Sequence, residues 1–229
     1  MPSPRSFASL VAITAALAGA ATAIAAEIDG TAGNDTLLGT EDADRIRGLA
    51  GDDQIHGLAG SDRIDGGSGD DTLRGDGGCP EGTTGAPYYC IPDGPPGNDR
   101  ISGGSGEDQI FGNGGQDRIF SDSGDDVVEG NKGNDRVESG SGQDFVHGNK
   151  GNDKLTSDEG GDRIWGEKGN DRITPGADVD TVFGGKGNDR IFARDGATRD
   201  KVDCGKGQDV AIVDDEDKVK NNCETVRRR

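Results

Sequence analysis

Residues Gly30–Arg74 read GTAGNDTLL GTEDADRIR GLAGDDQIH GLAGSDRID GGSGDDTLR, which is one nine-residue unit repeated without a gap. Each unit follows the pattern Gly-x-x-Gly-x-Asp-x-aliphatic-x. Ten more units run from Gly103 to Phe192, and a sixteenth is assembled across a break from Gly75–Gly77 and Gly97–Ser102. A short fixed period is typical of a solenoid, in which each repeated position has one physical role.

Two positions of the repeat predict its backbone. Position four is Gly except at Asp42 and Asp178, and Gly tolerates the positive φ of a tight turn whose carbonyls point inward. Position eight is always aliphatic and is the middle residue of a three-residue strand, so it faces a core. We therefore expect an all-β solenoid that alternates turn and strand between two sheets, with eighteen residues in each coil.

An eighteen-residue superperiod supports two distinct sides. Position seven is basic in alternate units and mostly not in the others. The basic residues are Arg45, Arg63, Arg100, Arg118, Arg136, Lys154, Arg172 and Arg190. From Gly130 onward the same units carry Lys132, Lys150, Lys168 and Lys186 at position three, whereas the intervening units begin with Ser139, Ser157 or Pro175. This alternation keeps its phase only if residues 78–96 are a loop inserted within a turn.

Position six is Asp in every unit, and these are the candidate metal ligands: Asp35, Asp44, Asp53, Asp62, Asp71, Asp99, Asp108, Asp117, Asp126, Asp135, Asp144, Asp153, Asp162, Asp171, Asp180 and Asp189. Stacked carboxylates about 4.8 Å apart repel one another at neutral pH. Calcium takes six to eight oxygens and mixes carboxylates with carbonyls, whereas magnesium demands a tighter octahedron. In a metal-free solenoid, the Asp side chains would instead cap the turns.

The composition also favours a bound metal. The chain has a net charge of −19, 42 glycines and only 29% hydrophobic residues, a combination typical of disorder unless something neutralises the charge. Zinc or copper would require His or Cys ligands. The two histidines, His56 and His147, lie far apart at position nine, which we expect to face solvent.

The nonapeptide resembles the calcium-binding repeat of the RTX, or haemolysin-type, proteins over Gly30–Gly77 and Gly97–Phe192. The resemblance implies a parallel β-roll, a right-handed two-sheet solenoid, with calcium bound in the turns by carbonyls and by the sixteen aspartates. Eight turns in each row leave at most seven spaces for ions. Sites that touch Asp42 or Asp178 are expected to depart from the pattern.

The ends of the chain predict export. Residues 1–26 have Arg5, an apolar run and an Ala23-Ile24-Ala25 cleavage pattern, as in a secretory signal peptide; a membrane anchor is the alternative. Cys79 and Cys90 flank the inserted loop, and Cys204 and Cys223 flank the tail, so we expect two local disulfides. We expect residues 27–192 to form the roll and residues 193–229 to form degenerate repeats that cap it.

The function that these features indicate is a secreted or cell-surface calcium-binding roll in which calcium is structural. The alternative is an adhesive or extracellular-matrix module that binds a glycan or a protein along the roll. The basic row fits a polyanion, or simply pairs with outward acids such as Asp65 and Glu138. Phe111, Trp165 and Phe183 form an apolar strip at position nine. No catalytic constellation, nucleic-acid partner or membrane insertion is expected.

Overall fold

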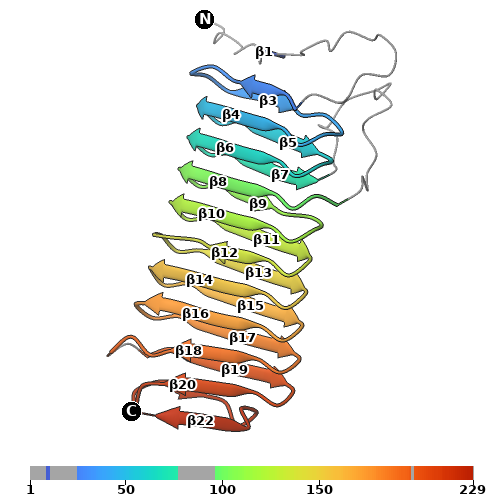
Figure 1. The fold of residues 1–229 in the computed structure, drawn as a ribbon. Helices are drawn as coiled ribbons and strands as arrows, with labels where there is room; N and C mark the ends of the chain where they lie inside the picture. Colours follow the sequence, from blue (N-terminus) through green and yellow to red (C-terminus); the bar gives the residue numbers. More distant parts are fainter. Residues whose placement is uncertain (1–8, 11–24, 77–95, 197–198, 229) are drawn as a thin grey trace, which may run out of the picture.

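The chain folds into two parallel β-sheets that face each other along an elongated roll (Figure 1). The structure is a computed structural model, and it describes residues 9–10, 25–76, 96–196 and 199–228. Each sheet has 11 strands, and consecutive strands alternate between the sheets. The predicted two-sheet parallel solenoid is therefore confirmed.

We call the two layers the odd sheet and the even sheet, after their strand numbers. The odd sheet contains β1 (Ser9–Leu10), β3 (Asp35–Leu38), β5 (Gln54–Leu58), β7 (Thr72–Asp76), β9 (Gln109–Phe111), β11 (Val127–Lys132), β13 (Phe145–Lys150), β15 (Arg163–Lys168), β17 (Thr181–Lys186), β19 (Lys201–Lys206) and β21 (Lys218–Val219). The even sheet contains β2 (Glu27–Asp29), β4 (Arg45–Ala50), β6 (Arg63–Ser68), β8 (Arg100–Ser105), β10 (Arg118–Ser123), β12 (Arg136–Glu138), β14 (Lys154–Glu159), β16 (Arg172–Ala177), β18 (Arg190–Ala193), β20 (Val210–Val213) and β22 (Thr225–Arg228).

The strand register confirms the eighteen-residue superperiod. Arg45 aligns with Arg63 and Arg100 aligns with Arg118, so the basic position-seven residues share the even sheet. Across the break, Arg63 aligns directly with Arg100. The alternation between sheets therefore continues through the split unit. The predicted inserted loop, with Cys79 and Cys90, falls almost wholly outside the described residues.

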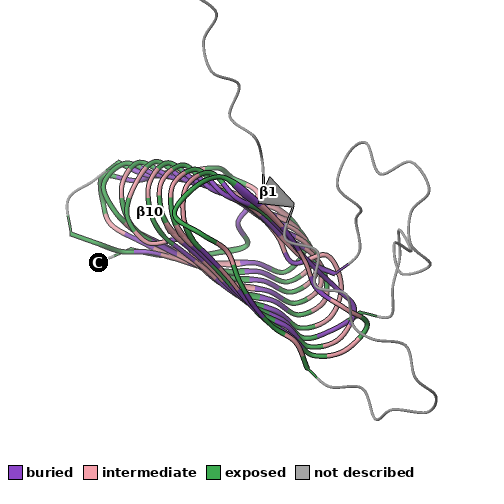
Figure 2. Cartoon of the chain, turned by 90° about the horizontal axis from the view of Figure 1, so that it is seen from above, coloured by how far each residue is buried: buried purple, intermediate pink, exposed green. Residues whose placement is uncertain are grey.

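The core is a pair of aliphatic ladders, one from each sheet. Position eight is inward as predicted, and Ile119, Val146 and Leu155 are all completely buried. Seen along the roll, the coils superpose as a flattened tube with this core between its two long sides (Figure 2). Because each coil contributes only two such side chains, the hydrophobic core is narrow for the amount of chain that it orders.

Position four is glycine in fourteen of the sixteen units, and at Gly151 the reason is that successive turns stack in direct backbone contact. Gly151 has φ 142°, and a Cβ atom built there would lie 1.3 Å from the carbonyl oxygen of Gly133 in the preceding coil. No side chain fits that space. The predicted turn conformation is confirmed at this position.

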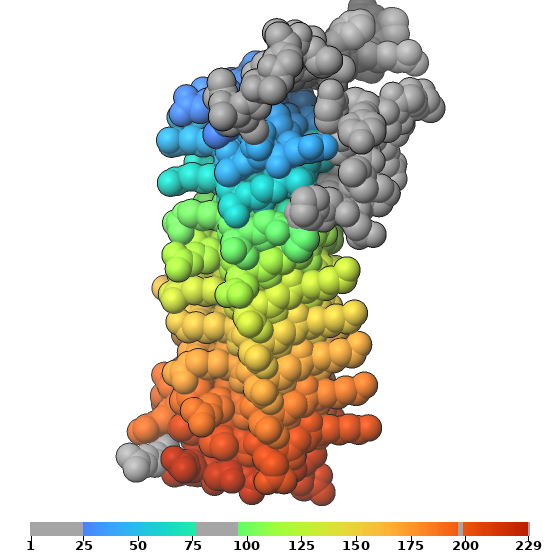
Figure 3. Space-filling model, turned by 45° about the vertical axis from the view of Figure 1, so that its right-hand side comes forward, coloured from blue at the N-terminus to red at the C-terminus, as the bar shows by residue number. Residues whose placement is uncertain are grey.

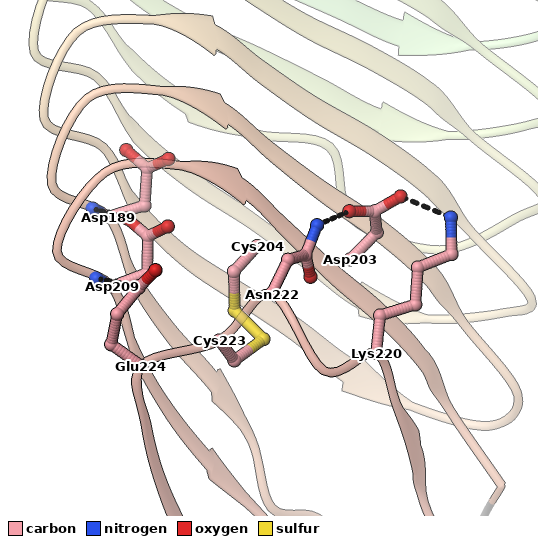
Figure 4. The surroundings of a disulfide bond; sticks show 8 residues. All are labelled: Asp189, Asp203, Cys204, Asp209, Lys220, Asn222, Cys223 and Glu224. Atoms are coloured by element: carbon pink, nitrogen blue, oxygen red, sulfur yellow. Dashed lines mark hydrogen bonds and ion pairs between the residues drawn. A yellow bond between two sulfur atoms is a disulfide. The ribbon is translucent and has the colours of Figure 1, made fainter.

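Both ends of the described roll continue the sheets. Ile28 on β2 aligns with Ile46, which extends the core before the first complete repeat. β1 falls within the predicted signal peptide and pairs with β3. At the other end, Cys204 of β19 forms the predicted disulfide with Cys223 (Figure 4). Within the described residues, no helix is long and apolar enough to cross a membrane.

His56 is an exception to the outward position-nine pattern. Its neighbours in the odd sheet, Leu38 and Arg74, are partly exposed, whereas His56 is only 4% exposed. The expectation that His56 is a surface residue is therefore wrong. Position nine points away from the core, so this burial arises on the outer face of the sheet and not between the sheets.

Candidate metal centre

The sixteen position-six aspartates form two continuous carboxylate ladders, and all are 4% exposed or less. The even ladder lies in turns that lead into even strands: Asp44, Asp62, Asp99, Asp117, Asp135, Asp153, Asp171 and Asp189. The odd ladder lies in turns that lead into odd strands: Asp35, Asp53, Asp71, Asp108, Asp126, Asp144, Asp162 and Asp180. The solenoid therefore brings together, on each side, residues that are eighteen or more positions apart in the sequence.

From Asp44 onward, Oδ1 of each position-six aspartate accepts a backbone N–H from the preceding coil. The Asp135 N–H donates to Oδ1 of Asp153 at 2.8 Å, and the Asp153 N–H donates to Oδ1 of Asp171 at 2.8 Å. The same bond spans the break, where the Asp62 N–H donates to Oδ1 of Asp99 at 2.7 Å. These bonds explain part of the recurrence of Asp along the repeat, because each of these carboxylates satisfies a buried backbone donor.

The other carboxylate oxygen, Oδ2, is buried and has no hydrogen-bond partner among the described residues in fourteen of the sixteen aspartates. The exceptions are Asp35 and Asp44 at the start of the roll, whose Oδ2 atoms accept from Thr31 and Thr40. In three of the fourteen, Asp126, Asp144 and Asp162, burial raises the pKa and the nearby hydroxyl of Ser121, Ser139 or Ser157 partly lowers it. An ionised oxygen deprived of water and of donors is costly. These fourteen oxygens are therefore the candidate ligands for a cation.

Burial raises the pKa values of these carboxyl groups despite their backbone hydrogen bonds. Desolvation is the largest effect, and it raises the pKa of Asp117 to about 9 and of Asp153 to about 8. Donation from the preceding Asp N–H lowers the pKa in each case, and repulsion by neighbouring carboxylates raises it again. Without a cation, the carboxyl groups of the ladders therefore favour the neutral, protonated form.

A carbonyl oxygen faces the same space as each orphaned Oδ2 in turns that begin with glycine. A Cβ atom built on Gly148 would lie 2.6 Å from Oδ2 of Asp153 and 3.0 Å from the carbonyl oxygen of Gly166 in the next coil. Within the described residues, no three His, Cys, Asp or Glu side chains converge on one point. A cation here would therefore take backbone carbonyls as well as carboxylates, which is the mixture that calcium accepts.

The two ladders differ in the second half of the roll. The odd ladder replaces glycine at position one by Ser121, Ser139, Ser157 and Pro175. The Ser121 hydroxyl donates to the carbonyl oxygen of Ser139 at 2.8 Å, and the Ser157 hydroxyl donates to the carbonyl oxygen of Pro175. These side chains occupy the space that the glycine turns leave open, so the odd ladder is less suited to a cation from Ser121 onward.

The tail extends both ladders beyond the predicted sites. The Asp180 N–H donates to Oδ1 of Asp200 at 2.9 Å, and the Asp189 N–H donates to Oδ1 of Asp209 at 2.8 Å. The last acceptor on the even side is Glu224, which binds the Asp209 N–H at 2.8 Å (Figure 4). The Asp-x-aliphatic step that survives in the tail is the sequence signal for these additional members.

The two units that lack glycine at position four behave differently. Asp178 has φ 79°, in the left-handed region used by glycine, whereas Asp42 is not among the described residues with positive φ. The Asp42 N–H instead donates to the Thr40 hydroxyl at 3.2 Å. The turn at Asp42 therefore has its own local conformation, as expected for a departure from the repeat.

A further buried carboxylate lies at the break in the repeats. Asp76 is 6% exposed, and its two oxygens accept from the N–H groups of Gly97 at 2.9 Å and Gly114 at 3.2 Å. Its charge raises the pKa values of Asp99 and Asp117. Sequence reasoning did not single out Asp76, because it lies at position two, where the repeat specifies no residue type.

These features define a repeat β-solenoid whose turns present carboxylate and carbonyl oxygens between stacked coils. The family model for the RTX calcium-binding nonapeptide repeat (4 copies) matches most of the chain, at residues 29–64, 48–78, 94–128, 120–155, 147–182, 156–191 and 174–210. The chain therefore belongs to the RTX calcium-binding nonapeptide repeat family. No curated protein matches the chain.

Proposed function

We propose that this chain is a structural calcium-binding roll in which calcium ions between successive turns hold the coils together. The proposed ligands are the position-six aspartates of both ladders, from Asp35 to Asp189, together with turn carbonyls. The observation that carries the proposal is the set of fourteen buried Oδ2 atoms without a donor among the described residues. Bound calcium would supply the positive charge that those oxygens lack.

Within each turn, the two carboxylate oxygens and the position-one glycine have separate proposed roles. Oδ1 of the aspartate fixes the spacing between coils by accepting a backbone N–H, which leaves Oδ2 available for an ion. Glycine at position one keeps the space beside Oδ2 open. The proposed role of calcium is structural, and catalysis forms no part of it.

Exchanging the position-one residues between the two ladders tests this proposal. Gly148→Ser would place a Cβ atom 2.6 Å from Oδ2 of Asp153 and is expected to lower the number of calcium ions bound. Ser121→Gly removes the hydroxyl that donates a hydrogen bond to the Ser139 carbonyl oxygen. This variant is expected to bind calcium more strongly. Calorimetric titration measures both. Equal calcium binding by the parent and by both variants would show that position one does not border an ion site.

We also propose that the mature protein is exported and begins at Ala26 or Glu27. The Ala26 N–H donates to Oδ1 of Asp44 at 2.7 Å, in the place where other coils use an aspartate N–H. Apart from the two-residue strand β1, the continuous coils therefore begin where the predicted signal segment ends. The Cys204–Cys223 disulfide suits an oxidising compartment. N-terminal sequencing of protein recovered from the medium tests this. Retention in the cell with Met1 at the N-terminus contradicts it.

A second candidate function is calcium-dependent adhesion along the roll. It is favoured by a row of exposed lysines that the fold itself does not require: Lys132, Lys150, Lys168, Lys186 and Lys206.

A further inference from the structure

One edge of the odd sheet carries five lysines in register, which we call the lysine ladder: Lys132, Lys150, Lys168, Lys186 and Lys206. All five are exposed and stand at the ends of β11, β13, β15, β17 and β19. In Figure 3, side chains project in a row from one edge of the roll, over the segments coloured from yellow to red. Neighbouring strands are about 4.8 Å apart, so the ladder spans about 19 Å.

The lysine ladder opposes folding and has no ion-pair partner among the residues that the structure describes. Like charges that face each other on adjacent strands destabilise a sheet. Among the described residues, the ion pairs lie elsewhere and none involves these five lysines. The equivalent position on the even sheet carries Ala50, Ser68, Ser105, Ser123, Ser141, Glu159 and Ala177. Six of these seven residues are Ala or Ser and the seventh is Glu159. The turn geometry therefore does not require a basic residue, and the lysines need another explanation.

A neutral row of hydrogen-bonding side chains lies beside the lysine ladder. Asn134, Asn152, Asn170 and Asn188 are exposed at position five of the same turns. Each of the first three accepts from the N–H of the next through Oδ1 at 2.7 Å. The equivalent position on the other edge includes the carboxylates Asp52, Asp70 and Asp125, linked in the same way. The lysine edge is therefore free of this row of acids, although the whole chain has a net charge of −19.

The last three lysines border a shallow hollow of about 510 Å³, together with Glu167 and Asn222. Glu167 also lies 3.2 Å from Nδ1 of His147, and Asn222 donates to Asp203 at 2.6 Å (Figure 4). The two side chains are thus held by the protein at the borders of the hollow. A linear ligand that follows the ladder would have space beside the lysines here.

Basic residues on the even sheet, by contrast, have several partners within the protein. Arg136 pairs with Glu138, which is one of the outward acids that the sequence suggested. The guanidinium groups of Arg100 and Arg172 lie over the rings of Phe120 and Phe192 at 4.5 and 4.1 Å. The lysine ladder is therefore the stronger candidate for an external anion.

We propose that the lysine ladder binds an acidic polysaccharide, laid along the roll axis with its carboxylate or sulfate groups against successive lysines. The step between lysines is close to the length of one sugar ring in an extended chain. The neighbouring Asn amides supply donors for sugar hydroxyls. This proposal deepens the adhesive candidate and rests on the calcium proposal only in requiring a folded roll.

The aromatic residues argue against a single-stranded nucleic acid as the occupant. Such ligands stack their bases on exposed aromatic faces. Here His147, Trp165 and Phe183 stack on one another, with ring planes 5° and 6° apart and centroids 4.4 and 5.5 Å apart. Their faces cover one another along the roll, so Trp165 and Phe183 of the predicted apolar strip do not form an open stacking platform. Phe111, the third member of that strip, lies under the guanidinium of Arg74 instead.

The test uses a six-sugar oligouronate and a sulfated oligosaccharide of equal length, with the folded mature protein in saturating calcium. The lysine variant is K150Q/K168Q/K186Q. The control variant is R118Q/K154Q/R190Q, which removes the same charge from the even sheet. The lysine variant is expected to bind at least one of the oligosaccharides about tenfold more weakly, because three exposed charge contacts are lost. The control variant is expected to bind as the parent does.

Several outcomes overturn the proposal. They are failure of the folded parent to bind either oligosaccharide, an equal loss in the control variant, and tighter binding of single-stranded DNA or of anionic phospholipid vesicles. Circular dichroism of each variant in calcium separates these outcomes from loss of the fold. If the parent folds without calcium but the lysine variant still loses binding, only the structural calcium proposal fails.

Discussion

Chelation of calcium is expected to convert the mature chain from a β-roll into a largely unfolded chain. In the roll, fourteen buried Oδ2 atoms have no donor among the described residues. Leaving a buried polar group unsatisfied costs about 1–3 kcal/mol, and more when it is charged. Even the lower figure, applied to fourteen groups, is comparable with the whole stability of a typical domain, about 5–15 kcal/mol. Far-UV circular dichroism in excess chelator measures the result.

Acid should partly replace calcium in this experiment. Burial raises the pKa of Asp71 to about 7, of Asp153 to about 8 and of Asp117 to about 9, from an ordinary value of 3.8. The calcium-free roll therefore binds more protons than the unfolded chain. Its stability is greatest below about pH 4 and is lost as the pH rises through these values. The chelated protein is expected to show more β-structure at pH 5 than at pH 8, and magnesium is expected to restore it poorly at pH 8.

Replacing one aspartate is expected to reduce calcium binding in a way that no core mutation reproduces. Asp153 and Leu155 belong to the same unit, and both are buried. Asp153→Ala removes a proposed calcium ligand, Oδ2, and the acceptor of the Asp135 N–H. The calcium concentration at the folding midpoint should rise about ten- to hundredfold, because charged hydrogen-bonding contacts contribute about 1.5–3 kcal/mol. Calorimetric titration should also count fewer ions.

Leu155→Ala provides the matched control. It should destabilise the calcium-loaded roll by about 2–5 kcal/mol through lost burial and an internal cavity. The proposed ligands are unchanged in this variant, so at saturating calcium it should bind as many ions as the parent. If Asp153→Ala matches the parent in both midpoint and ion count, position six is not the ligand. If Leu155→Ala loses ions at saturation, the calorimetric count reports folding and not ligation.

The period of the sequence was sufficient to predict the roles that recur in every coil. Position eight was predicted to fill the core and position four to form the turn, and Leu155 and Gly151 do so. Position six was predicted to stack, and the bonds from Asp135 to Asp153 and onward follow that stack. Each of these roles depends on the local backbone and on one translation along the roll, so a repeated pattern contains enough information to assign it.

Contacts between coils were less accessible to sequence reasoning. The replacement of glycine by Ser121 and Ser139 was visible, but its effect on the space beside the carboxylates needed the stacking of neighbouring turns. The tail was harder because the spacing along the odd ladder changes to 20 residues between Asp180 and Asp200. A strict nine-residue count therefore ends before Asp200, although the ladder continues.

The most direct test of the structural role of calcium is a titration of calcium into the chelator-treated mature protein at neutral pH. Bound ions are counted by calorimetry, and β-structure is followed by far-UV circular dichroism on the same sample. The orphaned Oδ2 atoms predict that β-structure appears in step with ion binding and is complete only when the turn sites are filled. A chain with full β-structure before the first ion binds would contradict the proposal that calcium holds the coils together.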